Sequence, residues 1–276
     1  MNNIIDKISI HIEWIFSGIG VTVLVVALSF VGFFIKKIFL NAVSDLEHPD
    51  TATTYNNAAL VYSRQGDYPK ALELYYKALV ISEKELDLEH PDTAITYNNI
   101  AAVYEMQGDY PKALEWYYKA LEIYEKVWGV DHPDTATTYN NIATVYKNQG
   151  DYPKALELYQ KDLEISEKVL GVDHPGTAIT YNNIAFVYAD QGDYPKALEL
   201  YQKSLEIKEK VLGVDHPDTA TTYNNIATVY AEQGNYPKAL EWFHKALAIR
   251  EKILGPEHPN TINTKEDIAA VKALLK

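Results

Sequence analysis

Cysteine is absent from the 276 residues of the chain. Its absence excludes a disulfide framework, a thiol nucleophile and a metal site with thiolate ligands. Basic residues are few as well: 25 Lys and Arg stand against 38 Asp and Glu, and the formal net charge is −13 at pH 7. An acidic surface repels phosphate backbones, so the composition argues against a nucleic-acid partner.

Motifs that carry catalysis are also missing. The sequence contains no glycine-rich phosphate loop, no Gly-x-Ser-x-Gly elbow and no His-Glu-x-x-His pair of metal ligands. We therefore expect a protein that is not an enzyme and that uses neither a cofactor nor a metal ion.

Charge is missing from one stretch near the N-terminus. Residues 14–35 carry none, and a helix of that length, about 33 Å, would cross a hydrocarbon core of about 30 Å. The stretch is too long for a signal peptide and offers no good cleavage site, so we expect an uncleaved transmembrane helix within an N-terminal segment 1–40. Lys36 and Lys37 follow it directly, and the positive-inside rule then places the remaining residues in the cytoplasm.

Small residues within this stretch would let two such helices approach, but their spacing departs from the small-xxx-small pattern. They are Gly18, Thr22, Ala27, Ser29 and Gly32. They indicate a homo-oligomer only weakly.

A unit of 42 residues is copied along the rest of the chain. Thr-Tyr-Asn-Asn recurs with its tyrosine at Tyr55, Tyr97, Tyr139, Tyr181 and Tyr223. His-Pro recurs in the same register at His48, His90, His132, His174, His216 and His258. A fixed period of this length indicates a solenoid. We divide the region into a linker 41–48, five repeats 49–258 and a C-terminal capping helix 259–276.

Each unit is expected to form a helical hairpin. In the second unit, Pro91 and Asp92 open a helix that ends near Gly108, and Asp109 caps a second helix that Gly129 stops. The predicted apolar face consists of Tyr97, Ile100, Ala101, Tyr104, Ala113, Leu114, Tyr117, Ala120, Leu121 and Ile123. Such a face can be buried only against the next hairpin.

These apolar and glycine positions resemble the signature of tetratricopeptide repeats. The longer period, with Gly-Val-Asp-His-Pro-Asp-Thr-Ala after the second helix, is most similar to kinesin light chains and to many bacterial proteins. The resemblance implies an all-α, right-handed superhelix, here preceded by the transmembrane helix. It also implies a concave groove that binds a protein or peptide, although the family binds many unrelated partners.

By the same resemblance, the first Asn of each Asn-Asn pair lines the groove and holds a peptide backbone, because a carboxamide both donates and accepts hydrogen bonds. These residues are Asn56, Asn98, Asn140, Asn182 and Asn224. The alternative is that both members of each pair form hydrogen bonds between the helices of the stack.

Some positions differ between otherwise similar copies. One turn beyond the first Asn the series runs Leu60, Ala102, Thr144, Phe186 and Thr228. A groove specific for one partner would vary in this way, and so would solvated positions under neutral drift. Kinesin light chains bind acidic peptides through basic groove residues; here only Arg64 and Lys147 lie at suitable positions. Asp162 also stands out, because the other copies carry Ala or Ser there and a buried carboxylate needs water or a partner group.

The histidines of the His-Pro pairs do not form a predicted metal site. Stacked helices lie about 8–10 Å apart, so histidines one repeat apart cannot share one ion with bonds of about 2 Å. We interpret them as elements that start a helix.

The sequence thus predicts a single-pass membrane protein with a cytoplasmic repeat scaffold that binds a protein or peptide. An alternative from another class is a membrane-active effector of a bacterial conflict or stress system, in which the repeats sense or oligomerise and the N-terminal helix perturbs the bilayer.

The anchor leads to a direct prediction. After carbonate extraction the full chain should sediment with membranes, and a fragment of residues 41–276 should remain in the supernatant, because only the uncharged stretch can enter a bilayer. Protease added to intact cells should leave the repeats uncut. A sedimenting fragment, or repeats digested from outside, would refute the anchor or its orientation respectively.

Overall fold

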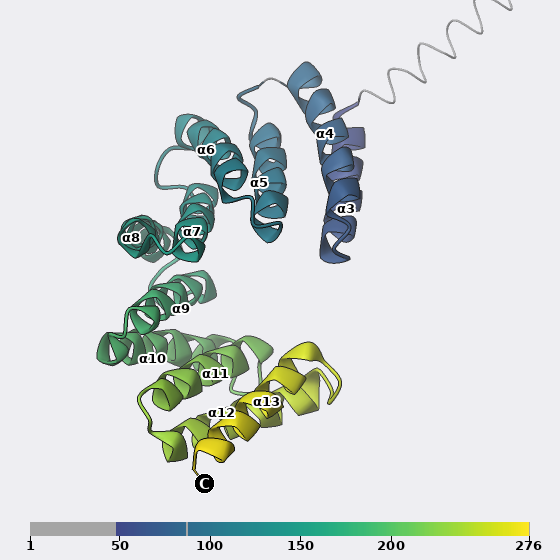
Figure 1. The fold of residues 1–276 in the computed structure, drawn as a ribbon. Coiled ribbons are helices and arrows are strands. Elements are labelled where there is room, and N and C mark those ends of the chain that lie inside the picture. The colour runs from purple at the N-terminus through teal and green to yellow at the C-terminus, as the bar shows by residue number, and fades with distance from the viewer. Residues whose placement is uncertain (1–47, 87, 276) are drawn as a thin grey trace, which may run out of the picture.

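The computed structural model describes residues 48–86 and 88–275, and this part of the chain is built from eleven α-helices without a strand (Figure 1). In chain order the helices are α3 (Pro49–Arg64), α4 (Tyr68–Glu85), α5 (Pro91–Met106), α6 (Tyr110–Val127), α7 (Pro133–Asn148), α8 (Tyr152–Val169), α9 (Pro175–Asp190), α10 (Tyr194–Val211), α11 (Pro217–Glu232), α12 (Tyr236–Ile253) and α13 (Pro259–Leu274). The all-helical solenoid predicted from the sequence is confirmed.

The predicted transmembrane helix lies outside the described residues. Among the helices that are described, none is both long enough and apolar enough to cross a bilayer.

Every odd-numbered helix begins at the proline of a His-Pro pair, and the preceding histidine caps it. In α5 the Nδ1 atom of His90 accepts a hydrogen bond from the backbone amide of Asp92 at 3.2 Å. The same bond, at 3.0–3.2 Å, caps the other odd-numbered helices through His48, His132, His174, His216 and His258. The predicted role of these histidines in starting a helix is confirmed.

The turn inside each hairpin depends on one glycine and one cap. Gly108 has a φ of 76°, in the left-handed region where a side chain is unfavourable. Asp109 then caps α6, because its Oδ1 atom accepts from the amide of Lys112 at 3.3 Å. These two residues reverse the chain within a few positions, so α5 and α6 pack side by side.

The hairpins bury their apolar faces against each other and against the next hairpin. Ile142 and Ala143 of α7 and Tyr159 of α8 are fully or almost fully buried in one cluster, which Ala101 and Ala113 of the preceding repeat join. Alanine at such points lets two helices approach closely.

In the second unit most of the predicted face is buried. Tyr104 and Leu114 are only half-buried, whereas Val103 on α5 and Tyr124 on α6, which the periodicity did not single out, are buried.

Polar contacts between repeats recur with the same period. The hydroxyl of Tyr97 on α5 donates to Glu83 on α4 at 2.9 Å. Equivalent bonds join Tyr139 to Glu125, Tyr181 to Glu167 and Tyr223 to Glu209. In the terminal helix Lys265 takes the place of the tyrosine and pairs with Glu251 at 2.8 Å. The polar substitution thus keeps the contact and adds a surface charge.

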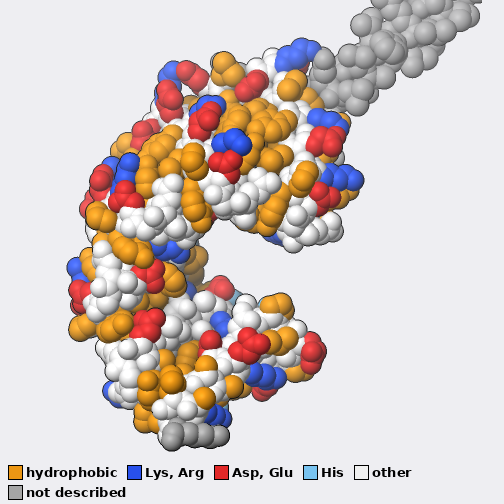
Figure 2. Space-filling model, in the orientation of Figure 1, with side chains coloured by type: hydrophobic (Ala, Val, Ile, Leu, Met, Phe, Trp, Pro, Cys, Tyr) orange, Lys and Arg blue, Asp and Glu red, His pale blue; other side chains and the backbone are white. Residues whose placement is uncertain are grey.

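The hairpins follow one another along an open curve (Figure 1). Helices α5, α7, α9 and α11 lie on its inner side, where consecutive odd-numbered helices contact one another, and α6, α8 and α10 lie on the outer side. The space-filling view shows the hollow that the curve encloses (Figure 2). We call the surface of the odd-numbered helices on this side the inner groove.

Nearest-neighbour stacking makes the position of a helix break important. Ala143→Pro removes a backbone donor in the middle of the stack, at a cost of about 3 kcal/mol or more, and it also disturbs a buried contact with neighbours on both sides. Ala270→Pro breaks α13, whose Ala270 is exposed and which, among the described helices, packs mainly against α12.

Thermal unfolding followed by circular dichroism should therefore show a much larger loss of Tm and of cooperativity for Ala143→Pro. Equal losses in the two variants would show that the array does not unfold as a nearest-neighbour stack.

Candidate functional site in the inner groove

The first Asn of each pair is half-buried between consecutive odd-numbered helices. In the first two repeats its amide group donates to a threonine of the next repeat: Asn56 to Thr96 at 2.9 Å and Asn98 to Thr138 at 3.3 Å. The carbonyl oxygens of both carboxamides are buried and have no hydrogen-bond partner among the described residues. These asparagines link α3 to α5 and α5 to α7.

The later asparagines also contact neighbouring repeats, but through other partners. Asn140 accepts from Asn183 at 3.1 Å, and Asn182 accepts from Asn225 at 3.1 Å. Asn224 accepts from Arg250 and from Thr264, each at 3.2 Å. In every copy, then, the first Asn forms hydrogen bonds between helices. Its role in holding a peptide stays a prediction.

The residues one turn further along fall into two groups. Leu60 and Phe186 are 39% and 40% exposed and give the inner groove two apolar patches. Ala102 packs against the core, and the hydroxyl of Thr144 bonds to Tyr159 at 2.8 Å, so neither is free for a ligand. The hydroxyl of the exposed Thr228 donates to a backbone carbonyl of its own helix. Arg64 is exposed at the end of α3.

Lys147 is half-buried beside Phe186, with its Nζ atom 4.5 Å from the centre of the ring. Burial lowers the pKa of Lys147, while the negative charges of Asp190 and Glu105 raise it. Lys147 thus lies between carboxylates of the preceding and the following repeat. The negative charges of these two carboxylates disfavour an acidic group beside Lys147.

Acidic side chains dominate this end of the groove. Burial raises the pKa of Asp190, and Lys147 lowers it. Burial also raises the pKa of Glu232, and repulsion by Asp190 raises it further. Asp190 and Glu232 thus place negative charge near each other at this end of the array.

Two cavities open between odd-numbered helices. The α7–α9 cavity has a volume of about 270 Å³ and is lined by Pro133, Thr137, Asn140, Asn141, Asp162, Ser166, Leu170, Gly176, Ile179 and Thr180. The α3–α5 cavity, about 180 Å³, is lined by Thr53, Asn56, Asn57, Leu60, Asp92, Ile95 and Asn99. The two share a threonine, an Asn pair and an isoleucine at equivalent repeat positions. Both members of an Asn pair thus line each cavity.

One position of the even-numbered helices differs strongly between copies and is buried in all of them. It is occupied by Ser82, Tyr124, Ser166, Lys208 and Arg250. The two cavities occur in the repeats that carry serine there. Lys208 instead reaches Thr222 at 3.0 Å, and Arg250 reaches Thr264 at 2.6 Å, so that long side chains occupy the space between the odd-numbered helices.

The sequence prediction missed this position, because Lys and Arg near a helix end are expected at the surface. A comparison of the five residues at this position, which lie 42 residues apart, would have identified it, because their side chains differ strongly in size and charge.

Asp162 forms part of the floor of the α7–α9 cavity and is only 3% exposed. Its carboxylate accepts hydrogen bonds from Asn140 at 2.6 Å, Thr180 at 2.6 Å and Ser166 at 2.9 Å. Burial raises the pKa of Asp162, and these three hydrogen bonds lower it. The sequence indicates that a buried carboxylate at this position needs a partner group. Three neutral side chains fill that role: they donate hydrogen bonds to Asp162 but do not neutralise its charge.

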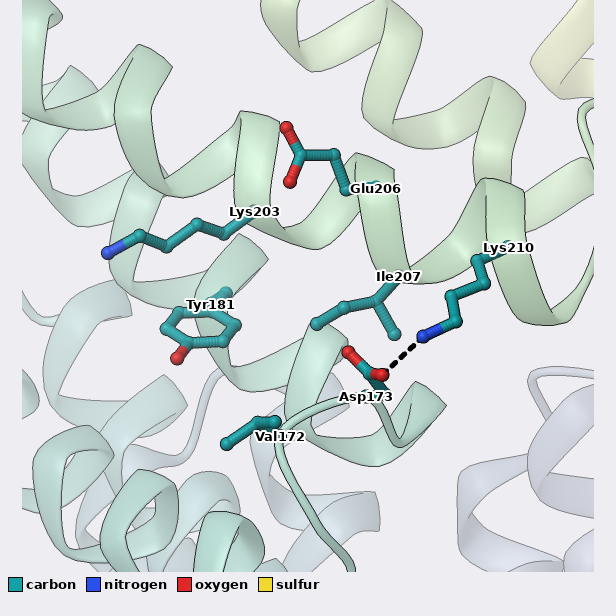
Figure 3. A pocket seen from close by; sticks show the side chains of 7 residues that line it. All are labelled: Val172, Asp173, Tyr181, Lys203, Glu206, Ile207 and Lys210. Atoms are coloured by element: carbon teal, nitrogen blue, oxygen red, sulfur yellow. Dashed lines mark hydrogen bonds and ion pairs between the residues drawn. The ribbon is translucent and has the colours of Figure 1, made fainter.

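A different set of cavities lies beside the loops between hairpins. Figure 3 shows one of about 330 Å³, with Tyr181 and Lys203 at one side and Asp173 paired with Lys210 at the other. Equivalent cavities of about 260 and 360 Å³ contain Tyr97 and Tyr139 with nearly the same neighbours. The lining residues of these loop cavities are nearly the same from repeat to repeat, whereas the residues of the inner groove differ.

The profile of the tetratricopeptide repeat matches residues 50–126, 134–210, 177–243 and 218–276. The chain belongs to the tetratricopeptide-repeat family. Among curated proteins, no relative matches the sequence.

Solved structures place the fold among kinesin-light-chain-like arrays. The chain is similar to BtubC (BKLC) from P. vanneervenii, with 26% identity, a TM-score of 0.65, and coverage of 81% of this chain and 88% of that one. It is also similar to a putative kinesin light chain with nearly identical repeats from Podosopora anserina, with 26% identity, a TM-score of 0.61, and coverage of 74% and 97%.

The apo form of RapI shares the fold at 22% identity, with a TM-score of 0.62 and coverage of 81% and 83%. The predicted tetratricopeptide repeats and their likeness to kinesin light chains are confirmed. Tetratricopeptide repeats typically form non-catalytic surfaces for protein interaction.

Asp162 yields a prediction about stability and pH. The native state binds a proton at Asp162 more tightly than the unfolded chain does, because burial raises its pKa. Ionised Asp162 therefore lowers the free energy of unfolding near pH 7, and this penalty disappears as the pH falls through the raised pKa. Asp162→Ala should unfold at an equal or higher temperature than the wild type at pH 7, and its advantage should shrink toward pH 4.

The variant carries the alanine found at Ala78, Ala120 and Ala246, which leaves Asn140 free to donate to Thr180 as its counterparts do. Asp131→Ala, which removes an exposed carboxylate paired with Lys168, serves as the control and should show no such gain. A stability difference that grows in acid would contradict the assignment.

Proposed function

We propose that this protein is a non-catalytic scaffold that binds a protein or peptide segment in the inner groove and holds it at a membrane. One observation carries the proposal. The side chains that differ between otherwise similar repeats lie around the inner groove and its cavities, whereas the loop cavities repeat nearly the same residues. Uniform positions suit a scaffold, and varied positions suit recognition of one partner.

The chemistry of the groove fits a peptide. Leu60 and Phe186 offer apolar anchor points three repeats apart along the curve. Carboxamides of the Asn pairs line both cavities, and Asn57, the second member of its pair, is exposed. Carboxamides can donate to and accept from a peptide backbone whatever the peptide side chains. The carboxamides would bind the peptide backbone of any sequence, and the apolar anchor points would select among peptide side chains.

The charge of the groove restricts the partner. The negative charges of Glu105 and Asp190 act on Lys147, and that of Asp190 acts on Glu232. A neutral or basic segment would be attracted, and an acidic one repelled. The proposed partner therefore differs from the acidic peptides that kinesin light chains bind, as the scarcity of basic groove residues in the sequence indicated.

Membrane attachment is the second part of the proposal. It rests on the uncharged residues 14–35 and on Lys36 and Lys37 behind them, which together favour one span with the repeats in the cytoplasm. Attachment would hold a captured partner close to the bilayer and raise its effective concentration there.

A binding experiment tests the first part. The full chain, purified in detergent micelles, is panned against a displayed library of random dodecapeptides, and synthetic versions of the binders are titrated by calorimetry. Phe186→Ala should weaken binding about fivefold or more, because truncating a groove anchor costs more than 1 kcal/mol. Its Tm should change little, since Phe186 is 40% exposed.

Val172→Ala is the matched control. It removes methyl groups from a side chain that is 58% exposed beside a loop cavity, and it should leave affinity unchanged. Binders that depend on Val172 but not on Phe186 would move the binding site to the loop cavities and contradict the proposal.

Leakage of ions from liposomes that contain the protein, with and without the repeats, tests the effector alternative. A scaffold leaves the bilayer tight in both forms. Leakage that the repeats control would replace the scaffold with a membrane effector.

A further inference from the structure

Three departures from the repeat pattern meet in the α7–α9 cavity. Asp162 replaces the alanine or serine of the other copies, Gly176 replaces an aspartate, and Ser166 stands where three other copies carry Tyr, Lys or Arg. Asp162 and Ser166 lie one turn apart on α8, Gly176 lies in the first turn of α9, and all three line one cavity. Their convergence is what marks this cavity as a site.

The first departure puts an uncompensated charge on the cavity floor. The three hydrogen bonds to Asp162 come from neutral donors, and no described residue forms an ion pair with it. Oδ2 accepts two of the bonds and Oδ1 accepts one, so Oδ1 retains capacity for a further donor. A buried carboxylate without a counter-charge is unfavourable, and a cation that entered the cavity would relieve it.

The second departure removes a charge from the cavity wall. The position of Gly176 is occupied by aspartate in four other copies: Asp50, Asp92, Asp134 and Asp218. Asp92 lines the α3–α5 cavity with an exposed carboxylate. A Cβ atom at Gly176 would lie 3.1 Å from side-chain atoms of both His174 and Leu170. The α3–α5 cavity thus has its negative charge on an exposed wall residue, whereas the α7–α9 cavity has it on a buried floor residue.

The third departure supplies the volume. Tyr124, Lys208 and Arg250 fill the corresponding space in other repeats, whereas Ser166 is short and turns its hydroxyl to Asp162 at 2.9 Å. The cavity of about 270 Å³ that results has Leu170 and the exposed Ile179 in its walls.

From these contacts we infer that the α7–α9 cavity binds the cationic side chain of a lysine or arginine in the segment held by the inner groove. The methylene stem of such a side chain contacts Leu170 and Ile179, and its charged head donates to Asp162 Oδ1. An anionic side chain is repelled, and an apolar one leaves the carboxylate uncompensated. The site deepens the proposed function and depends on it.

The α3–α5 cavity is the internal control, because it has the same threonine, Asn pair and isoleucine. Alanine stands there at the position of Asp162, its aspartate is exposed, and its volume is smaller, about 180 Å³. An exposed carboxylate is screened by water and gains little from an ion pair. We expect no preference for a cation in this cavity.

The test uses dodecapeptides selected on the wild-type full chain in micelles. Each binder is synthesised with its arginine replaced by citrulline, or its lysine by acetyl-lysine, which removes the charge at nearly constant size. On the wild type, one such replacement should weaken binding at least about tenfold, because it removes a hydrogen bond between charged groups. On Asp162→Ala and Asp162→Asn the same replacement should have almost no effect.

Asp131→Asn is the protein control and should behave as the wild type, because Asp131 is exposed beside a loop cavity outside the inner groove. Circular dichroism confirms that each variant is folded, and alanine at this position is native to three other repeats. Binders that lack a cation, or whose affinity is unaffected by both changes at Asp162, would overturn the inference. If Phe186→Ala still weakens those binders, the groove function stands; if no peptide binds the groove at all, both fall.

Discussion

The structure depends on the burial of apolar surface between one hairpin and the next. A hairpin of two amphipathic helices has little interior of its own, so residues such as Ile142 and Tyr159 are buried in a cluster to which neighbouring repeats contribute. Complete burial of a large apolar side chain contributes roughly 1.5–3 kcal/mol. The ion pairs along the surface, such as Lys168 with Asp131, join exposed groups and contribute about 0–1 kcal/mol each. Apolar packing therefore provides most of the stability of the stack, and the surface ion pairs contribute little to it.

The repeats differ from one another mainly in the space between consecutive odd-numbered helices. Packing sets the distance between consecutive odd-numbered helices, and a single position on the even-numbered helix fills the gap or leaves it open. Lys208 and Arg250 fill it at the C-terminal end, whereas Ser82 and Ser166 occur in the repeats that have cavities. A few substitutions can thus change the shape and charge of the groove without changing the fold.

The elements of the fold could be predicted from local sequence because local chemistry determines them. Proline after histidine starts each odd-numbered helix, and Gly108 with Asp109 reverses the chain whatever the neighbouring repeat contains. The partners of the asparagines could not be predicted in the same way. Asn98 donates a hydrogen bond to Thr138, whereas Asn140 donates to Asp162. Asp162 lies on α8, and the packing of α8 against α7 and α9 brings its carboxylate within reach of Asn140. The buried Tyr124 and Lys208 were missed for the same reason.

Hydrogen–deuterium exchange tests the central claim, that the inner groove is the binding surface, most directly. Amide exchange of the full chain in micelles is compared with and without a saturating selected peptide. The account predicts new protection in α7 and α9, where the larger cavity and Phe186 lie, and little change in the loops that contain Val130 and Val172. Protection confined to those loops and to α8 and α10, with α7 and α9 unchanged, would contradict it.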